Sequence, residues 1–248
     1  EKKQAIEIIV EEVNGRVPVI AHIGSIGTKI TTELGQYAEK IGVDALSALP
    51  PFYYGFSNDE IFNYYQDISN STNLPITVYN ISHAHLMDLD MLKRLASIKN
   101  VKGVKYTAPT HFNFSKIKKE IGINFKIYSG MDEMSLSGLI SGADGIIGSF
   151  YNLMPELFVD IYAKIKEENI NEAKKIQEKI NIIIMYALSK SGYPFIKMGL
   201  NWLDVDSGYV RKPFTTFVDK EIENIIKKDL KKLTDQNDLS GIKFLEKL

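Results

Sequence analysis

Two side chains of this sequence, Lys105 and Tyr79, could act together on a carbonyl group. Lys105 follows the apolar residues Val101 and Val104 in a run that is typical of a buried strand, and it stands near the end of that run. A lysine at the edge of an apolar core either extends its amine to water or uses it in chemistry. In an apolar environment the amine loses its proton more readily, and the neutral amine can attack a ketone to form a Schiff base. Taken alone, Lys105 is compatible with either role.

Tyr79 stands at the end of the preceding strand-like run and could carry the protons that Schiff-base chemistry moves. The alternative for Tyr79 is a buried tyrosine whose hydroxyl is satisfied by hydrogen bonds. Neighbouring parallel strands bring their carboxyl ends together, so the two residues would be adjacent in a barrel. The pair therefore indicates Schiff-base chemistry more strongly than either residue does alone.

Other polar residues follow later strand-like runs. Asp132 and Glu133 either begin a helix, as its N-cap and its first-turn acid, or bind the hydroxyl groups of a substrate. Gly148 and Ser149 either let a ligand approach the backbone or form a tight turn. Both interpretations of each pair are open.

The spacing of the histidines in the sequence does not indicate a metal site. His83 and His85 alternate along the chain, but no acidic partners stand at metal-ligand spacing from them. We therefore predict that no metal is bound.

The strands and helices that must position these residues come from one repeated strand–helix unit. A short apolar run is followed each time by an amphipathic stretch with helical spacing, at intervals of 20 to 31 residues. The runs cover residues 17–23, 44–50, 75–81, 101–107, 125–130 and 145–150. Such alternation indicates a parallel sheet, and polar or aromatic residues after every run favour a (β/α)8 TIM barrel over a doubly wound sheet. No Gly-x-Gly-x-x-Gly segment follows the first run, which argues against a dinucleotide-binding fold.

The repeat gives six strands where a complete barrel has eight. Residues 1–13 predict a helix with no strand before it. No further strand is evident after residue 155, and residues 155–168, 170–192 and 219–233 are helical in pattern. We therefore expect an α/β barrel whose first two strands and first helix are absent from the chain; a six-stranded open fold is the alternative. In domain terms, residues 1–168 would form the (β/α) barrel and residues 169–248 a C-terminal helical extension packed on it.

Composition narrows the class of protein. The chain has 248 residues, 44% of them hydrophobic and 25% charged, with a formal net charge of −1. Near-neutral charge argues against a nucleic-acid partner, and the lack of cysteine excludes disulfides and thiolate chemistry. No apolar run reaches the roughly 18 residues that a membrane span needs, and no signal peptide is evident. We expect a cytoplasmic protein that acts on a small molecule and binds no membrane.

Five segments, taken in order, resemble the N-acetylneuraminate lyase and dihydrodipicolinate synthase superfamily of class I aldolase-like (β/α)8 barrels. They are VYNI, GVKYT, GMDEM, ADGIIGSFYN and RKPF. The resemblance runs from residue 1 to about 217, and the segments AHIG and DALSALPPFYYGFS are similar to the sialic acid lyase branch. It implies that Lys105 forms a Schiff base with the C2 ketone of N-acetylneuraminate and that Tyr79 moves the proton of the C4 hydroxyl. The products would be N-acetylmannosamine and pyruvate, with no cofactor beyond the covalent Schiff base on Lys105.

The resemblance also implies residues that bind the substrate's hydroxyl tail: Thr107, Gly130, Asp132, Glu133 and Ser149, with Gly148 beside them. Tyr53 matches a tyrosine that family members insert near a neighbouring subunit's site, which implies a homotetramer. Ala84 stands where the synthase branch carries an arginine for a second carboxylate, so the synthase activity is less expected. The family's Gly-Ser-Thr-Gly-Glu type loop, which binds the keto acid's carboxylate, would lie before Glu1 and is absent from the chain.

The expected function is therefore a carbon–carbon lyase of sialic acid catabolism. One alternative is another pyruvate-dependent aldolase of the superfamily, a 2-keto-3-deoxy sugar acid aldolase or a dihydrodipicolinate synthase. The other is a non-catalytic barrel that acts as a binding or assembly protein.

Overall fold

The computed structural model describes residues 1–215 and 219–248. The chain divides into two compact units. The first consists of residues 1–131 and 141–146, and the second of residues 132–140 and 147–248. The boundary expected after residue 168 follows the strand–helix repeat, and it stays a prediction.

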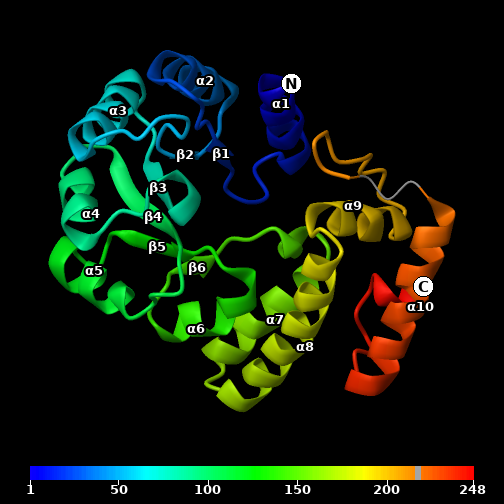
Figure 1. The fold of residues 1–248 in the computed structure, drawn as a ribbon. Coiled ribbons are helices and arrows are strands. Elements are labelled where there is room, and N and C mark those ends of the chain that lie inside the picture. The colour runs from blue at the N-terminus through cyan, green and yellow to red at the C-terminus, as the bar shows by residue number, and fades with distance from the viewer. Residues whose placement is uncertain (216–218) are drawn as a thin grey trace. The chain divides into compact units, whose positions relative to one another are not determined.

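The first unit contains a parallel sheet whose six strands pair in chain order. The strands are β1 (Ile20–His22), β2 (Ala45–Ala48), β3 (Ile76–Ile81), β4 (Val101–Thr107), β5 (Lys126–Ser129) and β6 (Gly145–Ile146). Each lies inside one of the six strand-like runs, so the predicted parallel α/β architecture is confirmed. The curled sheet with its helices fits a barrel-like α/β fold (Figure 1).

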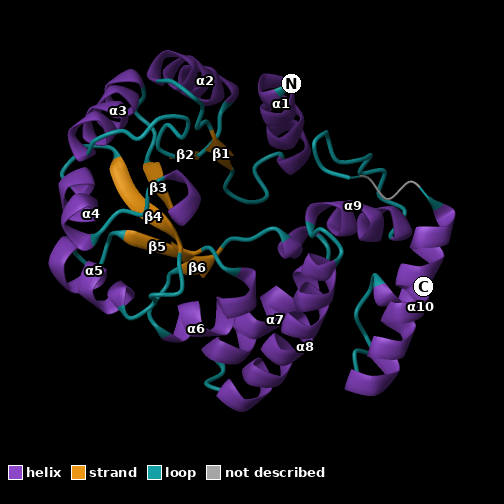
Figure 2. Cartoon of the chain, in the orientation of Figure 1, coloured by secondary structure: helices purple, strands orange, loops and turns teal. Residues whose placement is uncertain are grey.

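Helices cover one face of this sheet. They are α1 (Lys2–Val13), α2 (Thr28–Ile41), α3 (Asn58–Ser71), α4 (Leu89–Ala96) and α5 (Asn113–Ile121). Helices α2 to α5 follow β1 to β4 and form a layer along the outside of the strands (Figure 2). Leu46, Val78 and Val104 point into that layer and are fully buried. Because side chains alternate along a strand, their neighbours Tyr79 and Lys105 point to the opposite face.

Local sequence explains where two of these helices begin. Ser57 and Glu60 form a capping box at the start of α3, with the Ser57 N–H donating to the Glu60 carboxylate at 2.7 Å. Asp88 caps α4 by accepting a hydrogen bond from the Met91 N–H at 2.8 Å. Both helices therefore start directly after the loops that leave β2 and β3.

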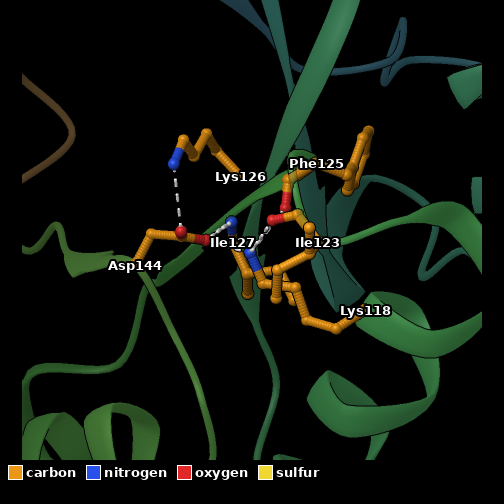
Figure 3. Close-up of polar contacts among 6 residues, drawn as sticks. All are labelled: Lys118, Ile123, Phe125, Lys126, Ile127 and Asp144. Carbon is orange, nitrogen blue, oxygen red and sulfur yellow. Dashed lines mark hydrogen bonds and ion pairs between the residues drawn. The ribbon is translucent and has the colours of Figure 1, made fainter.

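An ionic cluster joins the amino-terminal ends of β5 and β6 (Figure 3). Asp144, directly before β6, accepts hydrogen bonds from the Ile127 N–H at 2.8 Å and from the side chains of Lys118 and Lys126. Lys118 also donates to two backbone carbonyls in the loop 123–125. Partial burial alone would raise the pKa of Asp144, but these donors outweigh it and hold the pKa below its usual value. The cluster fixes the register of two strands with few backbone pairs of their own.

The second unit is helical. It contains α6 (Ser135–Ile140), α7 (Pro155–Lys166), α8 (Ile170–Ser189), α9 (Tyr193–Trp202) and α10 (Lys220–Asn237). Helices α6 and α7 pack beside α8, and Tyr186 of α8 donates to Asp229 of α10 at 3.1 Å (Figure 1). Trp202 at the end of α9 donates to Glu223 of α10 at 2.7 Å. The helical patterns after residue 155 correspond to α7, α8 and α10, while α9 was not predicted.

Among the helices of the described residues, none combines the length and the apolar composition that a membrane span requires.

Candidate active site

Lys105 and Tyr79 occupy paired positions on neighbouring strands. Their Cα atoms are register partners in the β3–β4 ladder, and Lys105 Nζ lies 4.2 Å from the centroid of the Tyr79 ring. Both side chains are half-buried. Within residues 1–215 and 219–248, neither the Lys105 amine nor the Tyr79 hydroxyl makes a hydrogen bond or an ion pair. Two polar groups capable of nucleophilic attack and proton transfer therefore lie together with no protein partner occupying them.

This arrangement bears on the two roles left open for Lys105. A lysine that only extends its amine to water would place the ammonium in solvent or beside a carboxylate. Here the amine lies over an aromatic ring, an arrangement that stabilises a cation without a hydrogen bond. The same position leaves the amine available to a carbonyl group of a ligand.

Asn80 holds the end of the strand that carries Tyr79. It is fully buried, its side-chain carbonyl accepts the Met87 N–H at 2.8 Å, and its amide donates to the Met87 carbonyl at 3.2 Å. These two bonds close the loop after β3. Sequence reasoning missed this role, although an asparagine directly after the tyrosine in the VYNI segment was a visible signal.

Thr107 and Gly130 lie beside Lys105. Thr107 is two residues further along β4 and so projects to the same face. The Gly130 N–H donates to the Tyr106 carbonyl at 2.9 Å, and a Cβ atom at Gly130 would overlap Thr107 Oγ1 and lie 3.2 Å from Lys105 Cε. Glycine is therefore required for this close approach. Thr107 Oγ1 is buried and has no hydrogen-bond partner among the described residues, so it could bind a ligand hydroxyl.

His22, at the end of β1, is a further member of this group that sequence reasoning did not assign. Its ring meets the Tyr79 ring edge-on, with centroids 6.1 Å apart and planes at 87°. His22 is an exposed residue of β1, but the protein atoms packed around its ring, and to a smaller degree the charges of Lys2 and Lys105, lower the pKa of His22 to about 4. The imidazole is therefore neutral at neutral pH. Its place at the end of the first strand-like run was a signal that could have identified it.

In the second unit the structure brings Asp132, Gly148 and Ser149 together. Asp132 is 7% exposed, and its Oδ2 accepts the N–H groups of Ser149 at 2.9 Å and of Phe150 at 2.8 Å. A Cβ atom at Gly148 would overlap the Asp132 carboxylate. The carboxylate thus fixes the loop that follows β6, a structural role that the N-cap and ligand-binding alternatives did not include. Glu133 lies half-buried in the same 3-10 turn as Asp132.

A cavity of about 390 Å³ in the second unit is bordered by Asp132 and Ser149. The remaining wall is formed by Phe150, Leu188, Ser191, Gly192, Tyr193, Ile196 and Phe214. A few polar groups in a largely hydrophobic wall are typical of small-molecule sites.

Tyr53 lies in the loop between β2 and α3. Its side chain is 77% exposed and packs edge-on against Tyr54, with ring centroids 4.8 Å apart. Among the described residues, no hydrogen bond or ring contact joins it to Lys105 or Tyr79.

As for metals, the part of the chain that the structure describes holds no group of three or more histidines and acids placed to bind one.

A free amine and a hydroxyl at the carboxyl ends of paired parallel strands define a class of protein: an α/β barrel-like protein equipped for covalent chemistry on a carbonyl. The family is given by comparison with known proteins. The model of the dihydrodipicolinate synthetase family matches residues 1–233, and the chain belongs to this family. The superfamily inferred from the five sequence segments is thereby confirmed.

Several solved structures are similar to this chain. CdNal from Clostridium difficile, solved in complex with mannosamine, is 34% identical with a TM-score of 0.88, and the match covers 94% of this chain and 80% of that one. N-acetylneuraminate lyase from Fusobacterium nucleatum, complexed with pyruvate, is 35% identical with a TM-score of 0.85, over 92% and 78% of the two chains. A dihydrodipicolinate synthase is 29% identical with a TM-score of 0.84, over 94% and 81%. The similarity extends to both branches of the superfamily.

Proposed function

We propose that the protein is a class I aldolase that cleaves N-acetylneuraminate to N-acetylmannosamine and pyruvate. Enzymes of its family work through a covalent Schiff base between a lysine and pyruvate, without an external cofactor. The observation that carries the proposal is the Lys105 amine, which lies over the ring of Tyr79 with no acidic partner among the described residues. Because no carboxylate of these residues is bound to it, this amine is available to form a Schiff base with a ketone.

In the proposed reaction, the amine of Lys105 attacks the C2 ketone of the open-chain sugar acid, and the resulting carbinolamine takes up one proton and loses water to form an iminium. The Tyr79 oxygen takes the proton of the C4 hydroxyl as it passes its own proton to the substrate's carboxylate, and the C3–C4 bond breaks. Its electron pair moves into an enamine on Lys105, and N-acetylmannosamine leaves as the aldehyde. A proton returned to C3 converts the enamine to an iminium, and water then releases pyruvate and the free lysine.

Binding of the substrate's hydroxyl tail is proposed for residues at or after the carboxyl ends of β4, β5 and β6. The unpartnered hydroxyl of Thr107 and the close approach at Gly130 support this role in the first unit. In the second unit, the cavity bordered by Asp132 and Ser149 supports it. Glu133 and Gly148 belong to the same two turns and are assigned to the tail by the family resemblance.

The choice of substrate rests on residue 84 and on the relatives. Ala84 is 9% exposed, so its site has neither the charge nor the side chain that would hold a second carboxylate. The Fusobacterium nucleatum relative, at 35% identity, is an N-acetylneuraminate lyase. The dihydrodipicolinate synthase at 29% identity favours a second candidate, another pyruvate-dependent aldolase of the superfamily. Comparing cleavage of N-acetylneuraminate with that of 2-keto-3-deoxy sugar acids separates the two.

The proposal is tested by the release of pyruvate from N-acetylneuraminate. Lys105→Ala is expected to lower kcat by at least about 1,000-fold, because no amine remains to form the iminium. Lys102→Ala is the matched control, since Lys102 is an exposed lysine of the same strand at the register shift before Gly103, outside the pairing of Lys105 with Tyr79. Equal activity of the Lys105→Ala variant and the unmodified protein would exclude the mechanism.

Assembly is proposed to be homotetrameric, with Tyr53 placed near the site of a neighbouring subunit. The loop around it supports this, because Phe52, Tyr53 and Tyr54 are all exposed aromatic residues, a type enriched at interfaces. Sedimentation or native mass spectrometry would measure the oligomer; a monomer at micromolar concentration would contradict the proposal.

We also propose that the six parallel strands belong to an eight-stranded barrel.

A further inference from the structure

The ring of Tyr79 is contacted from two directions. Lys105 Nζ lies over its face, 4.2 Å from the centroid, and the His22 ring meets it at 87° with centroids 6.1 Å apart. Edge-to-face pairs at this separation are favourable, and they fix the relative orientation of the rings. The contact with His22 comes from β1, which is not a neighbour of β3 in the sheet. The Tyr79 ring is therefore in contact with a residue from a distant part of the sequence.

The residues around the His22 ring leave a space that the ring fills. A Cβ atom at Gly24 would lie 2.9 Å from His22 Nε2 and 2.7 Å from the Leu49 N, so glycine at this position leaves the space that the ring occupies. Lys2 of α1 donates to the Gly24 carbonyl at 3.0 Å and holds the same turn. The ring nitrogens of His22 make no hydrogen bond within residues 1–215 and 219–248. Packing against Tyr79 is thus the specific contact that the structure gives this side chain.

The charges near the His22 ring are consistent with a packing role for His22. The amine of Lys105 already lies over the tyrosine ring, and the ammonium of Lys2 is close to the same turn. A cationic imidazole between them would be repelled by both. The lowered pKa of His22 keeps the ring neutral at neutral pH, so it packs against Tyr79 without adding charge beside the nucleophile.

We infer that His22 is a positioning residue for Tyr79: its ring holds the tyrosine in the orientation from which the hydroxyl exchanges a proton with the substrate bound at Lys105. This inference rests on the proposed aldolase function. It assigns His22 to the proton transfer of C–C cleavage and not to formation of the Schiff base, because Lys105 attacks the ketone with its own amine. The two steps can be measured separately.

The test compares His22→Ala, which removes the ring, with His22→Phe, which keeps an aromatic edge but has no ring nitrogen. The control is His83→Ala, which removes an exposed histidine from the turn after β3. Each protein is assayed for trapping of pyruvate by borohydride, for kcat and KM with N-acetylneuraminate, and for thermal unfolding. Should His22→Ala fail to fold, His22→Leu, with a side chain of similar size and no ring, takes its place.

We expect His22→Ala to be trapped with pyruvate to the same extent as the unmodified protein, with kcat lower by about 10-fold to 100-fold and KM little changed. His22→Phe should recover most of that kcat, and His83→Ala should match the unmodified protein. An unchanged kcat in His22→Ala would overturn the inference, as would a His22→Phe variant no better than His22→Ala. A parallel loss of trapping and of thermal stability would show a merely structural role and overturn it too. Failure of the aldolase proposal itself would be seen separately, as an unmodified protein that pyruvate and borohydride do not label.

Discussion

Replacing Gly130 by alanine tests the close approach between β4 and the end of β5. The new Cβ atom would overlap Thr107 Oγ1, would lie 3.1 Å from Thr107 Cβ and would lie 3.2 Å from Lys105 Cε. A real Cβ atom essentially never has a neighbour within 3.0 Å, so Thr107 must move. Lys105 must also give way by a few tenths of an ångström. The backbone of Gly130 is not in the left-handed region, so the strain comes from side-chain overlap alone.

The size of the effect follows from these contacts. Thr107 Oγ1 has no hydrogen-bond partner among the described residues, so its displacement breaks no bond and the stability cost is that of overpacking, about 1–3 kcal/mol. Displacement of a reacting group by about 1 Å costs on the order of 100-fold in rate, so a shift of a few tenths of an ångström at Lys105 corresponds to about 10-fold. We therefore expect a moderate loss of stability and a clear loss of activity.

Denaturant unfolding and the rate of pyruvate release measure the two effects. Gly55→Ala is the matched control, because its Cβ would meet no atom within 4 Å, and its free energy of unfolding should change by less than about 0.5 kcal/mol. A Gly130→Ala protein with the stability and rate of the Gly55→Ala protein would refute the reasoning. A loss of stability at unchanged rate would refute the placement of Lys105 beside Gly130.

Two further predictions concern carboxylates that accept hydrogen bonds from backbone N–H groups. Gly148→Ala should lower the free energy of unfolding by about 1–3 kcal/mol, because its Cβ would overlap Asp132; unchanged denaturant unfolding would contradict the close packing of that turn. Asp144→Asn should cost about 1–2 kcal/mol at pH 7, because the bonds from Lys118 and the Ile127 N–H lose their charged acceptor. The folded-state pKa of Asp144 is lowered, so its contribution is present above its ordinary pKa of 3.8 and is lost as pH falls through the lower folded value. The difference from the unmodified protein should therefore close below pH 3.8 in acid unfolding experiments, and a constant difference down to about pH 3 would argue against it.

Much of the first unit could be predicted from the sequence because the signals are local. Apolar runs and helical spacing depend on residues a few positions apart, and they located all six strands and the helices between them. The pairing of Lys105 with Tyr79 followed from parallel strands that end at one edge, and the two are register partners. The period of two in a strand likewise placed Thr107 on the face of Lys105.

The remaining features depend on contacts that no local pattern encodes. His22 meets Tyr79 because the sheet curls and brings β1 towards β3, and sequence periodicity carries no measure of that curl. Asp132 bonds to backbone groups 17 and 18 residues away, so its spacing suggested a helix cap and not a tie to a later loop. The side chain of Asn80 has its partner in Met87, across a loop whose path the sequence does not specify.

Reductive trapping tests the central claim most directly. Pyruvate and borohydride are added to the protein, the imine formed with loss of water is reduced by hydride to a stable secondary amine, and the modified peptide is identified by mass spectrometry. We predict that the label is found on Lys105 and that Lys105→Ala abolishes it while Lys102→Ala does not. An unlabelled protein, or a label on another lysine, would contradict the account.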